Sequence, residues 1–269
     1  MPPEATAQDL AQRQYREALA AGWDIPVGAH ILELGCGQGD MSAVLAQAVG
    51  STGHVTGVDI ASPDYGSPLT LGEATALLQA GPLGGRLSFR LRTDPLDEAI
   101  SFPQDAFDGV VMAHSAWYFS DLEQLRATLI RVIQWAPLLH FAEWDLEPTS
   151  VAQIPHLVAV LMQGLIAGYD PNTTANVRTP FSRQQLHTLL AETGWAVVHE
   201  FRVDTSLLQD GAWEADLALH DALPSIADLP VPAHMRDQLH SHGDVLRTLA
   251  ASAGIGTLPS YALTARRLP

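Results

Sequence analysis

Three glycines stand in five consecutive positions, Gly35, Gly37 and Gly39, directly after an apolar run. The segment HILELGCGQGDMSAVLAQAV regains helical periodicity after them, which predicts a strand, a tight turn and a helix. Glycine at such a turn usually means that something approaches the backbone closely. Glu33 stands two residues before the first glycine, and Cys36 lies within the turn. We interpret this segment as a ligand-binding loop.

An acidic residue, Asp59, follows twenty positions after Gly39, at the end of a predicted second strand. Open α/β sheets hold an adenosine in this way, because a carboxylate there accepts hydrogen bonds from the ribose hydroxyls. The dinucleotide pattern would require glycine at the next position after Gly39, where this chain has Asp40. A carboxylate at the start of the helix would repel a pyrophosphate. The alternatives are that Asp59 is a solvated strand end and that Glu33 caps backbone amides.

The pattern E-x-G-x-G-x-G from Glu33 to Gly39 resembles motif I of the class I S-adenosylmethionine-dependent methyltransferases. Their cofactor carries an amino group and a sulfonium but no phosphate. The resemblance implies that Asp59 binds the ribose, that Ile60 flanks the adenine and that Asp94 accepts from the adenine amino group. Residues implied to surround the cofactor are Glu33, Gly35, Cys36, Gly37, Gly39 and His114.

Stretches similar to the family cover residues 29–145, 181–204 and 259–267. The long loop DIASPDYGSPLTLGEA resembles a group of relatives named after the cyclopropane fatty acid synthases. The function implied is methylation of a small molecule by S-adenosylmethionine. A noncatalytic S-adenosylmethionine-binding protein and an NAD-binding oxidoreductase are the alternatives, and Asp40 opposes the second.

His114 lies in MAHSAWYF, where the fourth strand should end, and Glu143 ends the fifth. Methyl transfer from a sulfonium is an in-line displacement, so positioning does most of the work. A base is needed when the acceptor must lose a proton, and His114 and Glu143 are our candidates. Trp117 and Tyr118 are candidate acceptor contacts. The alternatives are that His114 is held structurally within its loop and that the two aromatic rings belong to the core.

The charge excludes several functions. Thirty acidic and fourteen basic residues leave a net charge of −16, which disfavours a nucleic-acid partner. All the basic residues are arginine, so the chain has no lysine for a Schiff base. His234, His240 and His242 are irregularly spaced, which favours a surface helix over a metal site.

Cysteine use and hydropathy predict a cytoplasmic protein. The single cysteine cannot form an intramolecular disulfide, and the beginning MPPEATAQDL lacks the features of a secretion signal. No apolar run approaches the roughly 18 residues of a membrane span. We therefore expect a small-molecule substrate and no membrane partner. Cys36 is interpreted as a small packed side chain.

These residues require a parallel, doubly wound α/β sheet to position them. Strands are predicted at 29–33, 54–58, 86–92, 107–113, 138–144, 195–203 and from 260, and helices at 7–20, 41–49, 71–79, 122–134, 151–167 and 182–194. The fold implied is Rossmann-like, with a seven-stranded mixed sheet whose last strand is antiparallel.

Two helical segments, 149–180 and 206–257, interrupt the sheet pattern and predict a cap over one end of the sheet. The remaining divisions are a cofactor-binding half at 1–148, a return to the sheet at 181–205 and a last strand at 258–269. The helix from His156 to Tyr169 is too apolar for a solvated surface. Tyr169 and Trp213 are therefore predicted to form walls of the acceptor site.

Overall fold

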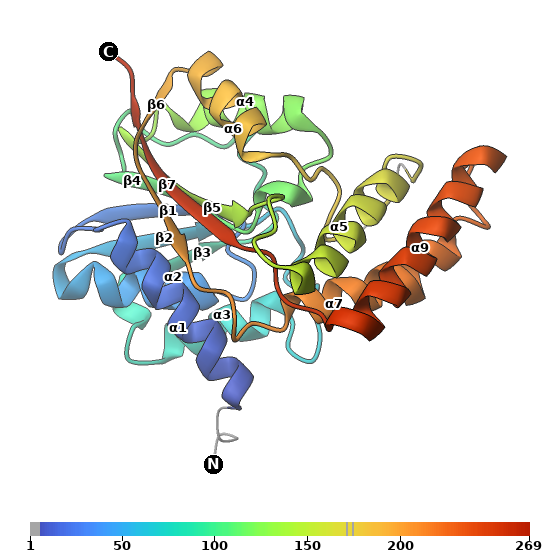
Figure 1. Cartoon of the computed structure of the whole chain (residues 1–269). Helices are drawn as coiled ribbons and strands as arrows, with labels where there is room; N and C mark the ends of the chain where they lie inside the picture. Colours follow the sequence, from blue (N-terminus) through green and yellow to red (C-terminus); the bar gives the residue numbers. More distant parts are fainter. Residues whose placement is uncertain (1–5, 171, 174) are drawn as a thin grey trace.

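The computed structural model describes residues 6–170, 172–173 and 175–269. Helices and strands alternate along the chain, and helices cover both faces of a central sheet (Figure 1). The α-helices are α1 Ala7–Gly22, α2 Asp40–Ala48, α3 Leu71–Ala80, α4 Leu122–Val132, α5 Ile154–Ala167, α6 Arg183–Glu192, α7 Asp210–Leu217, α8 Leu223–Ser225 and α9 Ala233–Ala253.

The seven strands form one sheet in the order β3-β2-β1-β4-β5-β7-β6. The strands are β1 His30–Leu34, β2 His54–Val58, β3 Leu87–Arg90, β4 Gly109–Ala113, β5 Leu138–Trp144, β6 Trp195–Val203 and β7 Ser260–Arg267. β7 runs antiparallel to both of its neighbours, and the other pairs are parallel. The predicted fold class, with its reversed last strand, is confirmed.

The central strands are buried on both faces, as parallel strands between helical layers must be. Leu32 of β1, Val110 of β4 and Phe141 of β5 are all fully buried. Local capping also follows the sequence: the Ser182 side chain accepts from the backbone N–H of Gln185 at the start of α6. β3 is shorter than the predicted strand 86–92.

The inserted segments form a cap with a hydrophobic core of its own. Met162 of α5, Leu246 of α9 and Ala218, in a π-helical turn after α7, are buried together. Figure 1 shows α5, α7 and α9 beside the end of the sheet toward which the β5 arrow points. Because ligands bind at the carboxyl ends of parallel strands, the cap stands next to the expected ligand crevice.

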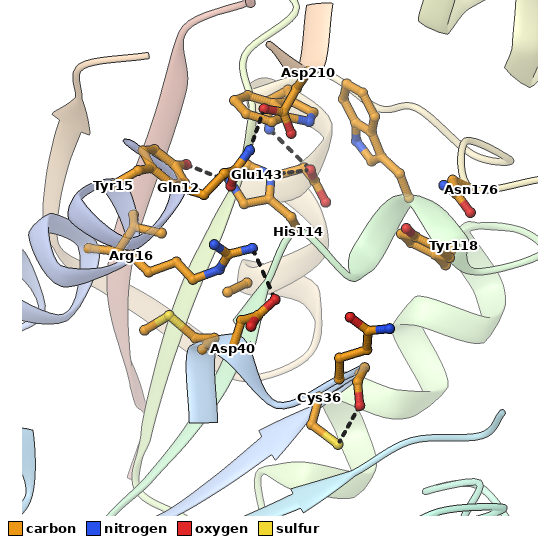
Figure 2. A pocket seen from close by; sticks show the side chains of 18 of the residues that line it. Gln12, Tyr15, Arg16, Cys36, Asp40, His114, Tyr118, Glu143, Asn176 and Asp210 are labelled. Carbon is orange, nitrogen blue, oxygen red and sulfur yellow. Dashed lines mark hydrogen bonds and ion pairs between the residues drawn. The ribbon is translucent and has the colours of Figure 1, made fainter. Parts of the chain in front are cut away.

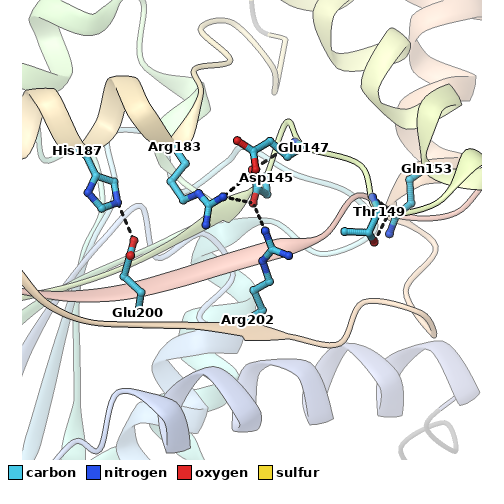
Figure 3. Close-up of polar contacts among 8 residues, drawn as sticks. All are labelled: Asp145, Glu147, Thr149, Gln153, Arg183, His187, Glu200 and Arg202. Atoms are coloured by element: carbon cyan, nitrogen blue, oxygen red, sulfur yellow. Dashed lines mark hydrogen bonds and ion pairs between the residues drawn. The ribbon is translucent and has the colours of Figure 1, made fainter.

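A buried carboxylate fixes the chain just beyond β5 (Figure 3). Asp145 has no exposed surface, and one of its oxygens lies 3.2 Å from Arg202 and 3.7 Å from Arg183. Its backbone N–H donates to the carbonyl of Pro259, before β7. Asp145 therefore ties β5 to α6, β6 and β7 two residues after Glu143.

Replacing both Arg183 and Arg202 with Gln should leave the Asp145 carboxylate buried without a compensating charge. We expect the free energy of unfolding to fall by about 3 kcal/mol in urea denaturation. Arg247→Gln is the control, because its ion pair with Asp244 is exposed and should contribute nothing measurable. A double variant as stable as this control would contradict the assignment.

Candidate functional site

The three glycines of the turn all have positive φ, but the surroundings of each would affect a larger side chain differently. A Cβ at Gly35 would lie 2.5 Å from the Cβ of Ser115, and one at Gly39 would lie 2.6 Å from a methyl carbon of Leu78. A Cβ at Gly37 would meet nothing within 4 Å. Gly35 and Gly39 are therefore required by packing, whereas Gly37 leaves space that a ligand can occupy.

Asp59 holds this turn in place. Its Oδ2 accepts from the backbone N–H of Gly37 at 2.8 Å, and its Oδ1 accepts from that of Ala61 at 2.8 Å. Each carboxylate oxygen has two lone pairs, so both can accept a further hydrogen bond from a ligand. Asp59 is therefore both a support for the loop and a candidate ligand contact.

The structure brings Ile60 and Asp94 to the same place, at the ends of β2 and β3. Ile60 follows Asp59 directly and is 63% exposed. The backbone N–H of Thr93 donates to the carbonyl of Asp59 at 2.9 Å, which places Asp94 beside it. Asp59, Ile60 and Asp94 are not among the lining residues of the central cavity, and Asp59 connects them to the glycine turn through its contact with Gly37.

The central cavity has a volume of about 290 Å³. Glu33, Gly35, Cys36, Gly37, His114, Trp117, Tyr118 and Glu143 line it, together with residues of α1 and α7. Figure 2 shows Asp210 and Gln12 at one end and Cys36 at the other, with His114 between them. The glycine turn and the candidate base therefore face one space.

Glu33 lies almost fully buried at the floor of this cavity. It accepts a hydrogen bond from the Ser42 hydroxyl, and burial raises its pKa to about 8. Nearby, the Arg16 guanidinium lies 3.7 Å from the Asp40 carboxylate. The hydrogen bond and the neighbouring charges therefore do not ionise Glu33 fully at neutral pH. A cationic ligand beside Glu33 would favour the ionised carboxylate and would be stabilised by it.

His114 has an unusual backbone conformation, with φ +51. Its Nδ1 lies 3.1 Å from Oε1 of Glu143, and its Nε2 lies 2.5 Å from the Tyr15 hydroxyl, which also lies 2.5 Å from Oγ of Ser260. Its ring packs 4.2 Å from that of Trp144, measured between centroids. Both ring nitrogens are therefore engaged, and strained backbone of this kind is concentrated at functional sites.

Glu143 has one oxygen in use and one without a partner. Oε1 accepts from the Trp144 backbone N–H at 3.1 Å and faces His114. Oε2 is buried without a hydrogen-bond partner in the structure, and the residue is 2% exposed. A buried carboxylate oxygen without a donor is costly, so this atom is suited to a ligand N–H or O–H.

The predicted cap walls are not found at the cavity. Trp213 is 50% exposed, and Tyr169 packs against the core of the cap. The reason is the orientation of α7, which turns Asp210 and Glu214, one helical turn apart, toward the cavity. Trp117 and Tyr118 do line it, as expected.

Sequence reasoning missed several polar residues of the cavity, among them Tyr15 and Arg16 from α1 and Asp210 and Glu214 from α7. Burial of Tyr15 was signalled by its helical spacing with Leu19, but nothing in the sequence indicated that α1 reaches the end of β4. Among the described residues, no group of three or more His, Cys, Asp or Glu side chains is placed to hold a metal ion.

Two further expectations concern single residue types. Cys36 is 5% exposed, and burial raises the pKa of its thiol, as expected of a packed side chain. His234, His240 and His242 lie on exposed positions of α9.

In the part of the chain that the structure describes, no helix has the length and apolar character needed to cross a membrane.

The sheet order with a reversed β7, the glycine turn after β1 and the acid after β2 define a nucleoside-binding protein of the methyltransferase fold. Comparison with known proteins agrees. A family model described as "Methyltransferase domain" matches residues 31–135. A solved relative that is 37% identical, and of which this chain covers 94%, shows the family: the chain belongs to the class I S-adenosylmethionine-dependent methyltransferases, and its cofactor is accordingly S-adenosylmethionine.

A solved cyclopropane-fatty-acyl-phospholipid synthase-like protein from Lactobacillus casei is 37% identical, with a TM-score of 0.86, covering 98% of this chain and 94% of that one. Methyltransferase phomM' of Diaporthe leptostromiformis is 30% identical, over 73% of this chain and 61% of that protein. Nocamycin O-methyltransferase of Saccharothrix syringae is 33% identical, over 49% of this chain and 47% of that protein. The chain thus spans less than two thirds of these two relatives.

Alanine substitutions in the turn should separate packing from ligand contact. Gly35→Ala combines positive φ with a clash against Ser115 and should lower the unfolding free energy by about 2 kcal/mol or more. Gly37→Ala should cost about 1 kcal/mol of stability. Because its methyl group enters the cavity, it should weaken S-adenosylhomocysteine binding at least tenfold in calorimetry. Unchanged affinity in Gly37→Ala would show that the ligand does not approach this loop.

Proposed function

We propose that this protein transfers a methyl group from S-adenosylmethionine to a small organic acceptor. The observation that carries the proposal is the cavity itself, which joins the open space at Gly37 to the Glu143 oxygen that has no partner. When bound, the cofactor supplies an electrophilic methyl group. The chain has to orient the two reactants and manage the acceptor's proton.

Cofactor recognition is assigned to the ends of β1, β2 and β3. Asp59 would accept from the ribose hydroxyls, and Ile60 and Asp94 would contact the adenine. Glu33 would lie beside the cationic amino and sulfonium groups, where its carboxylate favours positive charge. Arg16 is the one Arg or Lys among the described residues that line the cavity, and it is suited to the cofactor's carboxylate.

Proton removal is assigned to the pair formed by His114 and Glu143. Both nitrogens of His114 already have partners, so the atom free to accept a proton from the acceptor is Oε2 of Glu143. His114 then holds the carboxyl group in place through the contact between its Nδ1 and Oε1 of Glu143. Trp117 and Tyr118 would contact the acceptor from the same cavity.

Cofactor binding should release a proton at neutral pH. The pKa of about 8 means that most Glu33 is protonated near pH 7 without ligand, and an adjacent cation favours the ionised form. Calorimetric enthalpies of S-adenosylmethionine binding should therefore differ between phosphate and Tris buffers. Glu33→Gln should remove the difference. Equal binding enthalpies for the wild type in both buffers would contradict this prediction and indicate that the positive charge of the cofactor does not lie beside Glu33.

Glu143→Gln should bind S-adenosylmethionine normally yet turn over at least about 100-fold more slowly, because removal of a general base costs about 10²–10⁴-fold. His114→Gln, which removes the side chain that positions this carboxylate, should also bind the cofactor normally and turn over more slowly. The acceptor comes from a screen with radiolabelled cofactor. The matched control is His187→Gln, which breaks another His–Glu pair, with Glu200 at 2.7 Å (Figure 3). Turnover rates of these variants within a few-fold of the wild-type rate would show that the pair has only a structural role. Cofactor binding without turnover of any acceptor would instead support a noncatalytic binding protein.

A further inference from the structure

The charged side chains of the cavity are unequally distributed. Glu143 from β5 and Asp210 and Glu214 from α7 line its cap side, at a distance along the chain from the glycine turn. Arg16 is the one Arg or Lys among the cavity residues that the structure describes, and its charge is shared with Asp40. His114, when protonated, neutralises at most one carboxylate. The cap side therefore carries more carboxyl groups than cationic groups.

Neutral side-chain amides donate hydrogen bonds to the two acids of α7, Asp210 and Glu214. Oδ2 of Asp210 accepts from the Gln12 amide at 2.7 Å, and Oε2 of Glu214 accepts from the Gln163 amide at 2.7 Å. An amide donor satisfies a lone pair but does not cancel a charge. Burial raises the pKa of both acids, and the charges of Asp210 and Glu143 raise that of Glu214 further. The carboxylates of Asp210 and Glu143 therefore disfavour the ionised form of Glu214.

Glu143 supplies an independent indication of a ligand, since its buried Oε2 has no donor. Asp145, two residues later and equally buried, shows how this chain treats a structural carboxylate: Arg183 and Arg202 both approach it. No arginine approaches Glu143 in the same way among the described residues. Oε2 of Glu143 is therefore free to accept from an N–H or O–H group that arrives with a ligand, and a positively charged donor would form the stronger hydrogen bond.

We propose that the methyl acceptor is an amine, held as its ammonium ion by Glu143, Asp210 and Glu214. This inference rests on the proposed function and names its substrate class. The ammonium transfers one proton to Oε2 of Glu143. The freed nitrogen lone pair then forms the N–C bond while the C–S bond breaks, and the bonding electrons stay on sulfur. The product is again an ammonium ion, which the same carboxylates stabilise.

An uncharged or anionic acceptor fits this site poorly. A carboxylate would be repelled by the three acids, and an alcohol would leave their charges uncompensated. Trp117 and Tyr118 add aromatic surface on which an organic cation can pack. The neighbouring cavity, which shares Asn176, carries Asp170 and Asp221 but no Arg among its described lining residues. Negative charge thus continues beyond the first cavity.

The test compares three probes of similar shape, phenethylammonium, phenylethanol and phenylacetate, on the S-adenosylhomocysteine complex by ligand-observed NMR titration. Phenethylammonium should bind at least tenfold more tightly than the other two. The double variant Asp210→Asn, Glu214→Gln should weaken its binding at least tenfold. Asp216→Asn, an exposed acid on the same helix, is the matched control and should change nothing.

Folding of the variants is checked by their affinity for S-adenosylhomocysteine, which should equal that of the wild type. Their thermal stability should be equal or higher, because neutral side chains remove buried, mutually repelling charges. If the double variant does not fold, the two single variants replace it. Equal binding of the three probes, no binding of phenethylammonium at millimolar concentration, or unchanged binding in the variants would overturn the amine assignment. If the wild-type protein does not bind S-adenosylhomocysteine, that result would instead overturn the proposed function.

Discussion

The close contact between the end of β1 and the end of β4 is the constraint on which the site depends. Gly35 leaves so little room that a methyl group there would overlap the side chain of Ser115, whose Oγ donates to the carbonyl of Leu34 at 2.9 Å. The next residue back along the chain, His114, is thereby held in a left-handed conformation with its ring directed between Tyr15 and Glu143. One tight contact thus joins the glycine turn to the candidate base.

This contact lies where the strand order changes direction, since β1 pairs with β2 on one side and with β4 on the other. Chain segments leaving the two strands diverge toward opposite faces of the sheet, and a crevice opens between them. The sheet provides the floor of the cavity, and α1 and α7 provide its sides. The cap helices have a separate hydrophobic core, so their side chains can differ without disturbing the sheet.

The two acids near the end of β5 show how burial distinguishes structure from function. Asp145 is neutralised by arginines of α6 and β6 and stabilises the packing of the sheet edge. Glu143 is equally buried, yet one of its oxygens has no donor and faces the cavity wall. Because a buried carboxylate oxygen without a hydrogen-bond donor destabilises the folded chain, Oε2 of Glu143 is suited to a ligand that donates to it.

The sequence by itself determined the sheet, the glycine turn and the position of Asp59, because strand and helix periodicity and turn chemistry are local properties. It also located His114 and Glu143 at strand ends, from the alternation of elements. Only the tertiary structure decided which faces of α1 and α7 meet the cavity. That choice depends on how distant helices pack, and it brought Tyr15 and Asp210 in while leaving Trp213 outside. No periodicity within a helix records which neighbour its polar side chains will meet.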